Sequence, residues 1–571
     1  MGLGALPTEL VDQIARSLLR PRDVNALAKV NQGFFAIINP ILYKLEYNDK
    51  PVSNYALEWA VGKNNVETAR KALQYGAQLN AIERGRDCPL RYAVAQGHLP
   101  TVKLLLDHGA TIRDPMILGT AAFRGFDEIA ELLLDHGASP NMGCEDKTPL
   151  LYAVEKGNES TFTLLLQRGA DIFAHDATGL SALSYAVDGG CIRVLAKLLG
   201  LGFGKYQSLG DTGVAQVHAA QLGRLDAVKL FNKRGVDVNL ADGSGRTALY
   251  WAAVKDHCEM VPYLLKQGAS LEIRDDWGDT PALHAAIKGN TSIVKILLNH
   301  GADLEDVDDN GRTMLSWAAG QGHEDTTRLL LDRGASIETV DKERRTPLLL
   351  AADTNHVKTV EVLIDAGANV NCTDGKSSPL SIAAGRGNSH IVRLLLKAGA
   401  STKFTTTQKQ TPLILAAMSR GTSAVDTVRA LLKNGANTEV TDEDGKTPLF
   451  YTLREDKVLL DLLVSRGAKL DARDNFGRNL LMYASIGSHR EYIDTLIGMG
   501  LKANDQDGDG MTALHHAVMS QAADSMRPLL QNGADPEIRD HKGYSVYDLA
   551  RSKGSDDLLM EAERELESRR V

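Results

Sequence analysis

Residues 280–301 read TPALHAAIKGNTSIVKILLNHG, and this stretch predicts two short helices joined by a tight turn. Thr280 can cap the first helix through its hydroxyl, and Pro281 is tolerated at the first helical position because its missing N–H has no partner there. Gly289 suits a left-handed turn that ends this helix. The apolar residues of 292–301 then fall on one face of a second helix. One such pair cannot bury its own apolar face, so neighbouring pairs must stack.

The same pattern recurs along most of the chain. The opening of the first helix returns as CPLRYA (88–93), TPLLYA (148–153), SALSYA (181–186), TALYWA (247–252), TMLSWA (313–318), TPLLLA (346–351), SPLSIA (378–383), TPLILA (411–416) and TALHHA (512–517). A glycine about 16 residues after each opening marks the end of the second helix. Fifteen such glycines, from Gly76 to Gly533, recur at an average spacing of about 33 residues, which indicates an array of stacked units.

These markers resemble the ankyrin repeat family over about nine-tenths of the chain. The resemblance implies an all-α fold, an ankyrin-repeat solenoid in which helix pairs carry short β-hairpin fingers. We expect about fifteen units over 51–540 and capping helices over 541–571. In the twelfth unit, AMSRGTSAVDTV carries three extra residues, which should bulge between its helices. The thirteenth unit has Thr452 in place of the closing alanine.

Composition and charge exclude several classes of protein. The chain has 571 residues, 43% of them apolar, and a formal net charge of −9, so we expect no nucleic-acid partner. No apolar run approaches the roughly 18–20 residues that cross a bilayer, and the N-terminus lacks a secretory signal pattern, so we expect no membrane partner. The five cysteines are dispersed and predict reduced thiols in a cytoplasmic or nuclear protein.

Residues 1–50 lack the repeat and predict three amphipathic helices with a thin core. This segment resembles an F-box, with the opening Leu-Pro-x-Glu-Leu followed by apolar residues at helical spacing. The resemblance implies that an adaptor of the Skp type, belonging to a cullin–RING ubiquitin ligase, binds Leu6, Pro7, Glu9, Leu10, Ile14 and Leu18. The alternative is that the three helices only cap the solenoid.

The chemistry of enzymes and metal sites is not indicated. The sequence has no phosphate-binding loop, no nucleophile elbow and no HExxH motif. Asp505, Asp507 and Asp509 match the first half of an EF-hand loop, but His516 stands where a bidentate glutamate would be needed. We read His284 and His516 as structural parts of the repeat. We therefore expect no catalytic residues, no bound metal and no cofactor.

Partner contacts are expected on the hairpin tips and on the exposed ends of the first helices, the variable positions that bind partners in the ankyrin family. In the central units the resemblance assigns this role to Asp276, Trp277, Asp279, Lys288, Asp309, Asn310, Arg312, Gln321, Lys342, Glu343 and Arg345. Trp277 is the candidate anchor, because exposed tryptophans are typical of interface centres. The alternative for Trp277 is packing within its own hairpin.

The two resemblances together imply a non-enzymatic substrate receptor of an SCF-type cullin–RING ubiquitin ligase. The N-terminal helices would bind the Skp-type adaptor, and the solenoid would hold an unidentified target protein close to the ligase. The alternative is an ankyrin scaffold or regulatory protein with no ubiquitin-ligase link.

Overall fold

The computed structural model describes residues 46–47, 50–80, 88–143, 147–201, 209–420, 422–454, 457–487, 489–555, 557, 559–560 and 564. The predicted adaptor-binding residues, from Leu6 to Leu18, lie outside these residues. The chain divides into two compact units, Met1–Ser270 and Leu271–Val571. In the described part, the only regular strands are β1 (Glu46–Tyr47) and β2 (Lys50–Pro51), which pair antiparallel.

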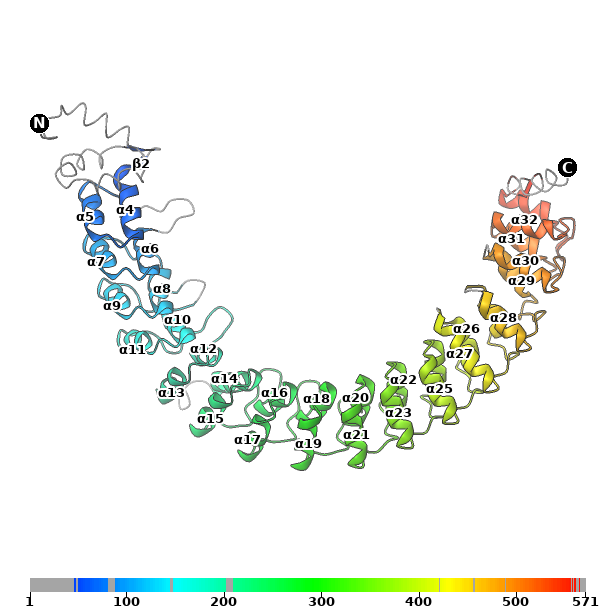
Figure 1. Cartoon of the computed structure of the whole chain (residues 1–571), viewed down its shortest axis with the longest axis horizontal. Helices are drawn as coiled ribbons and strands as arrows, with labels where there is room; N and C mark the ends of the chain where they lie inside the picture. Colours follow the sequence, from blue (N-terminus) through cyan, green and yellow to red (C-terminus); the bar gives the residue numbers. More distant parts are fainter. Residues whose placement is uncertain are drawn as a thin grey trace, which may run out of the picture. The chain divides into compact units, whose positions relative to one another are not determined.

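The first unit consists of helix pairs along the chain (Figure 1). They are α4 (Val52–Gly62) with α5 (Val66–Gln74), α6 (Pro89–Ala95) with α7 (Leu99–Asp107), α8 (Met116–Arg124) with α9 (Asp127–Asp135), α10 (Pro149–Lys156) with α11 (Glu159–Gln167), α12 (Ala182–Asp188) with α13 (Ile192–Gly200), α14 (Leu209–Gln221) with α15 (Leu225–Lys233), and α16 (Ala248–Val254) with α17 (Met260–Lys266).

The second unit continues the same pattern. Its pairs are α18 (Pro281–Lys288) with α19 (Thr291–Asn299), α20 (Met314–Gln321) with α21 (Glu324–Asp332), α22 (Pro347–Asp353) with α23 (Val357–Asp365), α24 (Pro379–Gly385) with α25 (Ser389–Lys397), α26 (Pro412–Met418) with α27 (Thr422–Lys433), the 3₁₀ helix η2 (Pro448–Arg454) with α28 (Lys457–Ser465), α29 (Leu480–Ile486) with α30 (Arg490–Gly498), and α31 (Ala513–Met519) with α32 (Ala523–Gln531); α33 (Val546–Lys553) follows.

The local signals in the sequence produce these helices as expected. The Thr280 hydroxyl accepts the backbone N–H of Leu283, so it caps α18. Gly289 ends this helix in the left-handed region at φ 74°, and Asn355 takes the same region at φ 64° after α22. The apolar face of α19 is fully buried at Ile293 and Leu297.

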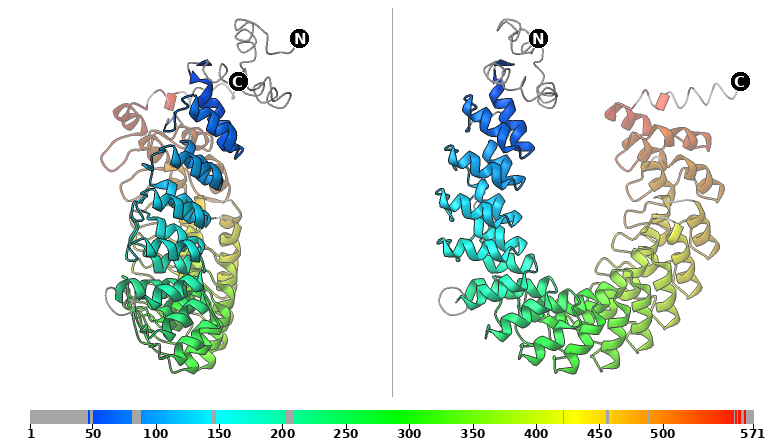
Figure 2. Two further views of the ribbon diagram at one scale, coloured as in Figure 1. Left: turned by 90° about the vertical axis from the view of Figure 1, so that its left-hand side faces the viewer. Right: turned by 60° about the vertical axis from the view of Figure 1, so that its left-hand side comes forward.

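Stacking of like helices builds each unit. In the second unit α18 packs on α20, α20 on α22, and α22 on α24, while the second helices form a parallel row in which α19 packs on α21 and α21 on α23 (Figure 2). Between successive pairs the chain forms a hairpin, and several hairpins close with one antiparallel bridge, such as Val307 with Thr313. The expected all-helical solenoid with short hairpins is confirmed for the described residues.

Two units depart from the repeat pattern, one by an insertion and one by a substitution. The three extra residues of the twelfth unit do not simply bulge between its helices, because α27 is 12 residues long where α25 has 9. Most of the insertion therefore extends the second helix, while Gly421 lies outside the described residues. In the thirteenth unit Thr452 is fully buried in η2, and its hydroxyl donates to the Leu449 carbonyl three residues back at 2.8 Å.

Candidate partner-binding surface

A buried aspartate holds the hairpin of residues 306–312 against its first helix, α20. Asp308 is only 7% exposed, and its Oδ1 accepts the backbone N–H groups of Asn310 and Arg312, each at 2.8 Å. Its Oδ2 accepts the indole N–H of Trp317 on α20 at 3.0 Å. One carboxylate thus fixes both the shape of the hairpin and its position on the helix.

We call an aspartate whose Oδ1 accepts two backbone N–H groups of its hairpin a hairpin aspartate; Asp275 and Asp341 are two others. The bond to the first helix recurs in both units. An aspartate accepts a hydrogen bond from an aromatic or histidine side chain nine residues later at Asp176–Tyr185, Asp242–Trp251, Asp308–Trp317, Asp442–Tyr451, Asp474–Tyr483 and Asp507–His516. The ring positions on the first helices are therefore structural, as expected for His516. Reasoning from the sequence missed the aspartates, although the nine-residue spacing is visible in it.

Hydrogen bonds favour the ionised form of two hairpin aspartates, Asp474 and Asp176. Burial raises the pKa of Asp474, but hydrogen bonds from the Arg478 guanidinium and backbone outweigh burial and leave the pKa below its usual value. At Asp176 burial is likewise outweighed by hydrogen bonds from Thr178 and Tyr185, which lower the pKa to about 2. At neutral pH these carboxylates are full acceptors for the hairpin N–H groups.

Neighbouring hairpins in the centre of the second unit are tied to one another. The Arg274 guanidinium donates to its own hairpin at the Gly278 carbonyl (2.7 Å) and to the next hairpin at the Val307 carbonyl (2.9 Å). The backbone N–H of Lys342 donates to the Asn310 carbonyl at 2.9 Å. The tips of these three successive hairpins therefore form one connected row.

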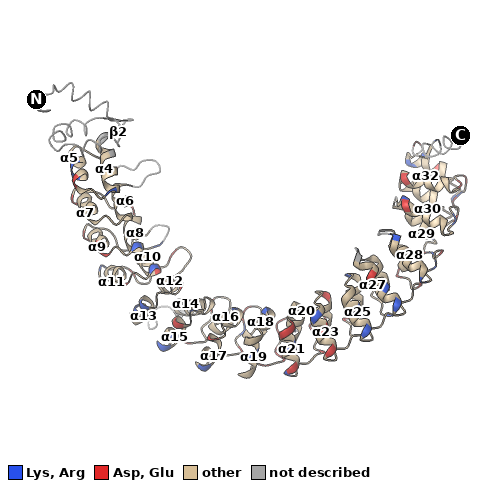
Figure 3. Ribbon diagram, viewed as in Figure 1, with Lys and Arg blue, Asp and Glu red and all other residues tan. Residues whose placement is uncertain are grey.

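Most of the predicted contact residues lie on this row or beside it. The exposed side chains at the hairpin tips are Asp276, Trp277, Asp309, Asn310, Lys342 and Glu343. Lys288 and Gln321 are exposed at the ends of α18 and α20. Trp277 is 59% exposed, which argues against complete packing within its own hairpin. Acidic and basic residues are interspersed along the helices of this unit (Figure 3).

Three predicted contact residues instead support the hairpins. Asp279 is 7% exposed, because it lies within its hairpin and its carboxylate accepts the Nδ1–H of His284 at 3.4 Å. Arg312 is half-buried over the Trp317 ring, 4.6 Å from the ring centroid. Arg345 donates to the hairpin aspartate Asp341 through Nε at 2.9 Å. The exposed position expected for Asp279 is therefore not found, and the two arginines are only partly available.

One group of side chains has the composition of a metal site. Asp275, Asp279 and His284 present ligand atoms within 4.8 Å of one another. However, Asp275 Oδ1 already accepts the backbone N–H groups of Trp277 and Asp279, each at 3.0 Å, as the other hairpin aspartates do. We interpret the group as a hairpin support.

Among the described helices, none is both long and apolar enough to span a bilayer.

Relatives of this chain are matched over parts of its length. A homologue of the transient receptor potential cation channel subfamily A member 1 from Caenorhabditis elegans is 27% identical over 219 residues, covering 34% of this chain and 18% of the relative. The ankyrin repeat domain-containing protein SAT10 of Stachybotrys chartarum is 34% identical over 198 residues, covering 33% and 10%. The E3 ubiquitin-protein ligase KEG of Arabidopsis thaliana is 26% identical over 234 residues, covering 37% and 14%. The matches thus span less than a fifth of these relatives.

The ankyrin repeat domain of human ASB11 is a structural neighbour with a TM-score of 0.36 and 28% identity, and the match covers 39% of this chain and 98% of that domain. The family model for ankyrin repeats matches residues 26–116, 113–176, 183–275, 268–341, 306–374, 335–405, 380–474 and 454–540. The first match begins inside the segment 1–50. These overlapping matches follow the helix pairs described above, and the chain belongs to the ankyrin repeat family.

Proposed function

We propose that the chain is a non-catalytic scaffold that binds another protein along the row of hairpin tips. The observation that carries this proposal is the exposure of Trp277 on hairpins that are tied to one another through Arg274 and the Lys342 backbone. A surface that is already ordered loses little conformational freedom on binding. An aromatic anchor among charges of both signs suits a folded protein or a peptide.

The narrower proposal is a substrate receptor of an SCF-type cullin–RING ubiquitin ligase. Its support is the F-box-like pattern from Leu6 to Leu18, which lies outside the described residues. Relatives named E3 ubiquitin-protein ligase, KEG and hecd-1, are compatible with this role, but the likeness to them lies in a part of each protein. No residue of this chain would transfer ubiquitin, because the receptor acts by holding its target close to the ligase.

A double substitution tests the narrower proposal. Leu10→Asp combined with Ile14→Asp should abolish co-purification of the Skp-type adaptor and leave the melting temperature of the solenoid unchanged. Val458→Asp is the control, because Val458 is an aliphatic residue of α28 that is 52% exposed. Adaptor binding that survives in a folded double variant would reject the F-box role. A large drop in melting temperature with no adaptor bound by the wild type would favour the alternative, in which these helices only cap a scaffold without a ligase link.

A further inference from the structure

A side-chain latch joins many successive repeats. At eight junctions of the described residues, the residue four positions after one repeat glycine accepts the backbone N–H of the residue two positions after the next repeat glycine. Glu305 accepts from Ser336 at 2.8 Å, and Glu338 accepts from Asn369 at 2.7 Å. The same bond is made at Asn80–Thr111, Asn141–Asp171, Asn239–Ser270, Asn371–Ser401, Glu439–Lys469 and Asn504–Asp535. The latch always uses a carboxylate or amide oxygen.

Lys403 occupies the acceptor position of the latch in the eleventh unit. It lies four residues after Gly399, as Glu305 does after Gly301. An ammonium group has only donors, so Lys403 cannot accept the N–H that the latch would bind. The corresponding N–H belongs to Asn437, two residues after Gly435. Within the described residues, the backbone N–H of Asn437 makes no hydrogen bond.

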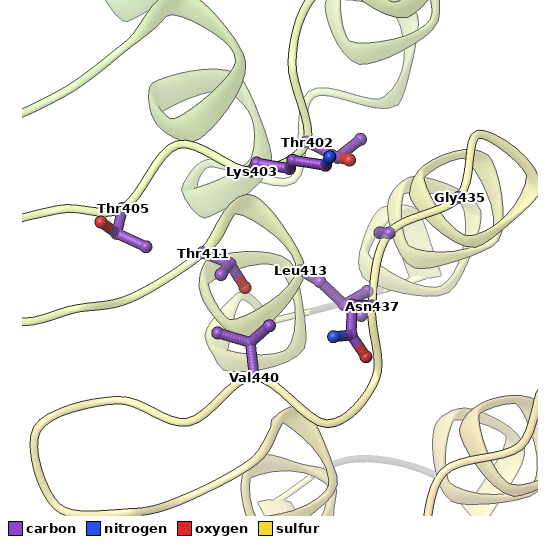
Figure 4. Close-up of a pocket in the computed structure, with 9 residues that line it drawn as sticks. Thr402, Lys403, Thr405, Thr411, Leu413, Gly435, Asn437 and Val440 are labelled. Atoms are coloured by element: carbon purple, nitrogen blue, oxygen red, sulfur yellow. The ribbon is translucent and has the colours of Figure 1, made fainter.

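A cavity of about 240 Å³ lies at this junction (Figure 4). Its lining residues come from the two adjacent repeats and are Thr402, Lys403, Thr405, Thr411, Leu413, Gly435, Ala436, Asn437 and Val440. No acidic side chain is among them. The Asn437 side-chain oxygen is already used by the Glu439 N–H, which leaves its amide N–H₂ as a donor. The wall is thus rich in donors and carries one cation.

Loss of the acceptor alone does not single out this junction. Arg113 and Phe173 also occupy the acceptor position in their units. At the Arg113 junction the Ser139 N–H is, among the described residues, likewise without a hydrogen bond. At Lys403 the missing acceptor also coincides with a cavity that is lined by the lysine and by threonine hydroxyls. The group that would complete this site is an anionic acceptor of the kind that glutamate supplies at the other junctions.

We propose that the cavity between the hairpins of Lys403 and Asn437 receives a carboxylate, an aspartate or glutamate side chain of a bound protein partner. The carboxylate accepts the Asn437 N–H and faces the Lys403 ammonium, which makes the hydrogen bonds charge-assisted. The incoming side chain takes the place that Glu305 and Glu338 occupy in their own junctions. This inference rests on the proposed function, since it assumes that the chain binds a protein.

The first experiment measures hydrogen exchange of the full chain in the segment that contains Asn437. The probes are a blocked glutamate and, as control, a blocked glutamine at equal ionic strength. Blocked glutamate should slow exchange in this segment, whereas blocked glutamine should leave it unchanged. Lys403→Glu should be protected without any probe, because it restores the latch, and Lys403→Met should respond to neither probe. Equal responses to the two probes, or an undiminished response of Lys403→Met, would overturn the site.

A second experiment separates a partner side chain from a free anion. The probes are acetate and a blocked pentapeptide with a central glutamate flanked by glycines. We expect the peptide to protect the Asn437 segment at a concentration at least tenfold below that needed for acetate, because its backbone adds contacts. Equal potency would assign the site to free carboxylates and overturn the role in partner binding. Both experiments are independent of the Trp277 surface. If Trp277 proved not to contact the target protein, the carboxylate site at Lys403 and Asn437 would not be affected.

Discussion

The hairpin of residues 306–312 and the hairpin of residues 404–410 have the same backbone course but differ in what holds them. In the first, Asp308 accepts two backbone N–H groups and the Trp317 indole. In the second, Thr406 stands at the aspartate position, and among the described residues its hydroxyl accepts one N–H group, that of Gln410, at 3.2 Å. The side chain of Leu415, nine residues after Thr406, has no hydrogen-bond donor. The second hairpin thus has fewer side-chain hydrogen bonds than the first. It is still tied to the next hairpin, because the Glu443 N–H donates to the Gln408 carbonyl at 3.2 Å.

The largest expected effect comes from removing a hairpin aspartate. Asp308→Ala leaves two backbone N–H groups and the Trp317 indole without their acceptor and should cost about 3 kcal/mol in the stability of the second unit. Thr406→Ala, the matched change in the other hairpin, should cost about 1 kcal/mol or less, because one hydrogen bond is lost. Urea unfolding followed by hydrogen exchange of each hairpin measures both. Equal costs would mean that the difference between the two hairpins has no energetic consequence.

The next effect concerns binding rather than folding. An exposed ring is present at Trp277, whereas Gln408 stands at that position in the hairpin of residues 404–410. Trp277→Ala should weaken binding of the target protein by about thirtyfold, close to 2 kcal/mol, with little change in melting temperature. Titration of the partner by calorimetry measures the affinity.

Phe476→Ala is the control for Trp277→Ala. Phe476 also stands two residues after a hairpin aspartate and is 60% exposed, against 59% for Trp277. It should leave the affinity unchanged if the binding surface lies on the central hairpins. If Trp277→Ala instead lowers the melting temperature and spares the affinity, Trp277 is hairpin packing and the central row is not the binding surface.

A smaller effect concerns the pH dependence of two helix caps, of which one contains a side chain that titrates and the other does not. The Thr512 N–H at the start of α31 donates to His515 Nδ1 at 3.2 Å, while the equivalent Ser378 N–H of α24 donates to the Ser381 hydroxyl. Burial lowers the pKa of His515 below its usual 6.5, so its neutral form is favoured in the folded chain. The unfolded chain then binds more protons, and stability present above pH 6.5 is lost as the pH falls through the folded pKa.

Hydrogen exchange of α31 and α24 between pH 7.5 and 5 tests this connection, after correction for the intrinsic pH dependence of exchange. Protection of α31 should fall toward the lower pH, whereas protection of α24 should stay constant. His515→Ser should remove the pH dependence, because serine can make the same capping bond without titrating. A pH dependence that persists in His515→Ser would assign it to another group.

The repeat pattern was sufficient to predict the fold because its signals are local and repeated. Thr280, Pro281 and Gly289 define the ends of one helix, and the same residue types recur at fixed spacing. An ambiguous helix boundary in one unit can therefore be assigned from the equivalent positions of the other units. The sequence predicted only in part which side chains form the exposed binding surface. Asp276 and Asp279 look alike in sequence, yet only Asp279 is buried, because the turn directs it toward His284. That Lys403 replaces a hydrogen-bond acceptor of the latch can be recognised only when the hydrogen bonds of the other junctions are known.

The smallest expected effect concerns Lys342, an exposed charge on a tied hairpin. Its backbone N–H holds the neighbouring hairpin through the Asn310 carbonyl, and this bond does not depend on the side chain. Lys342→Ala should therefore leave the row of tips in place and change target affinity by less than about threefold at physiological salt, since exposed charges are screened. Its main effect should be on the association rate at low salt, because charges at the rim of an interface steer the encounter. Stopped-flow association over a range of salt concentrations measures this. A large loss of affinity that persists at high salt would place Lys342 in the buried centre of the interface and would shift that centre from Trp277 toward the third hairpin of the row.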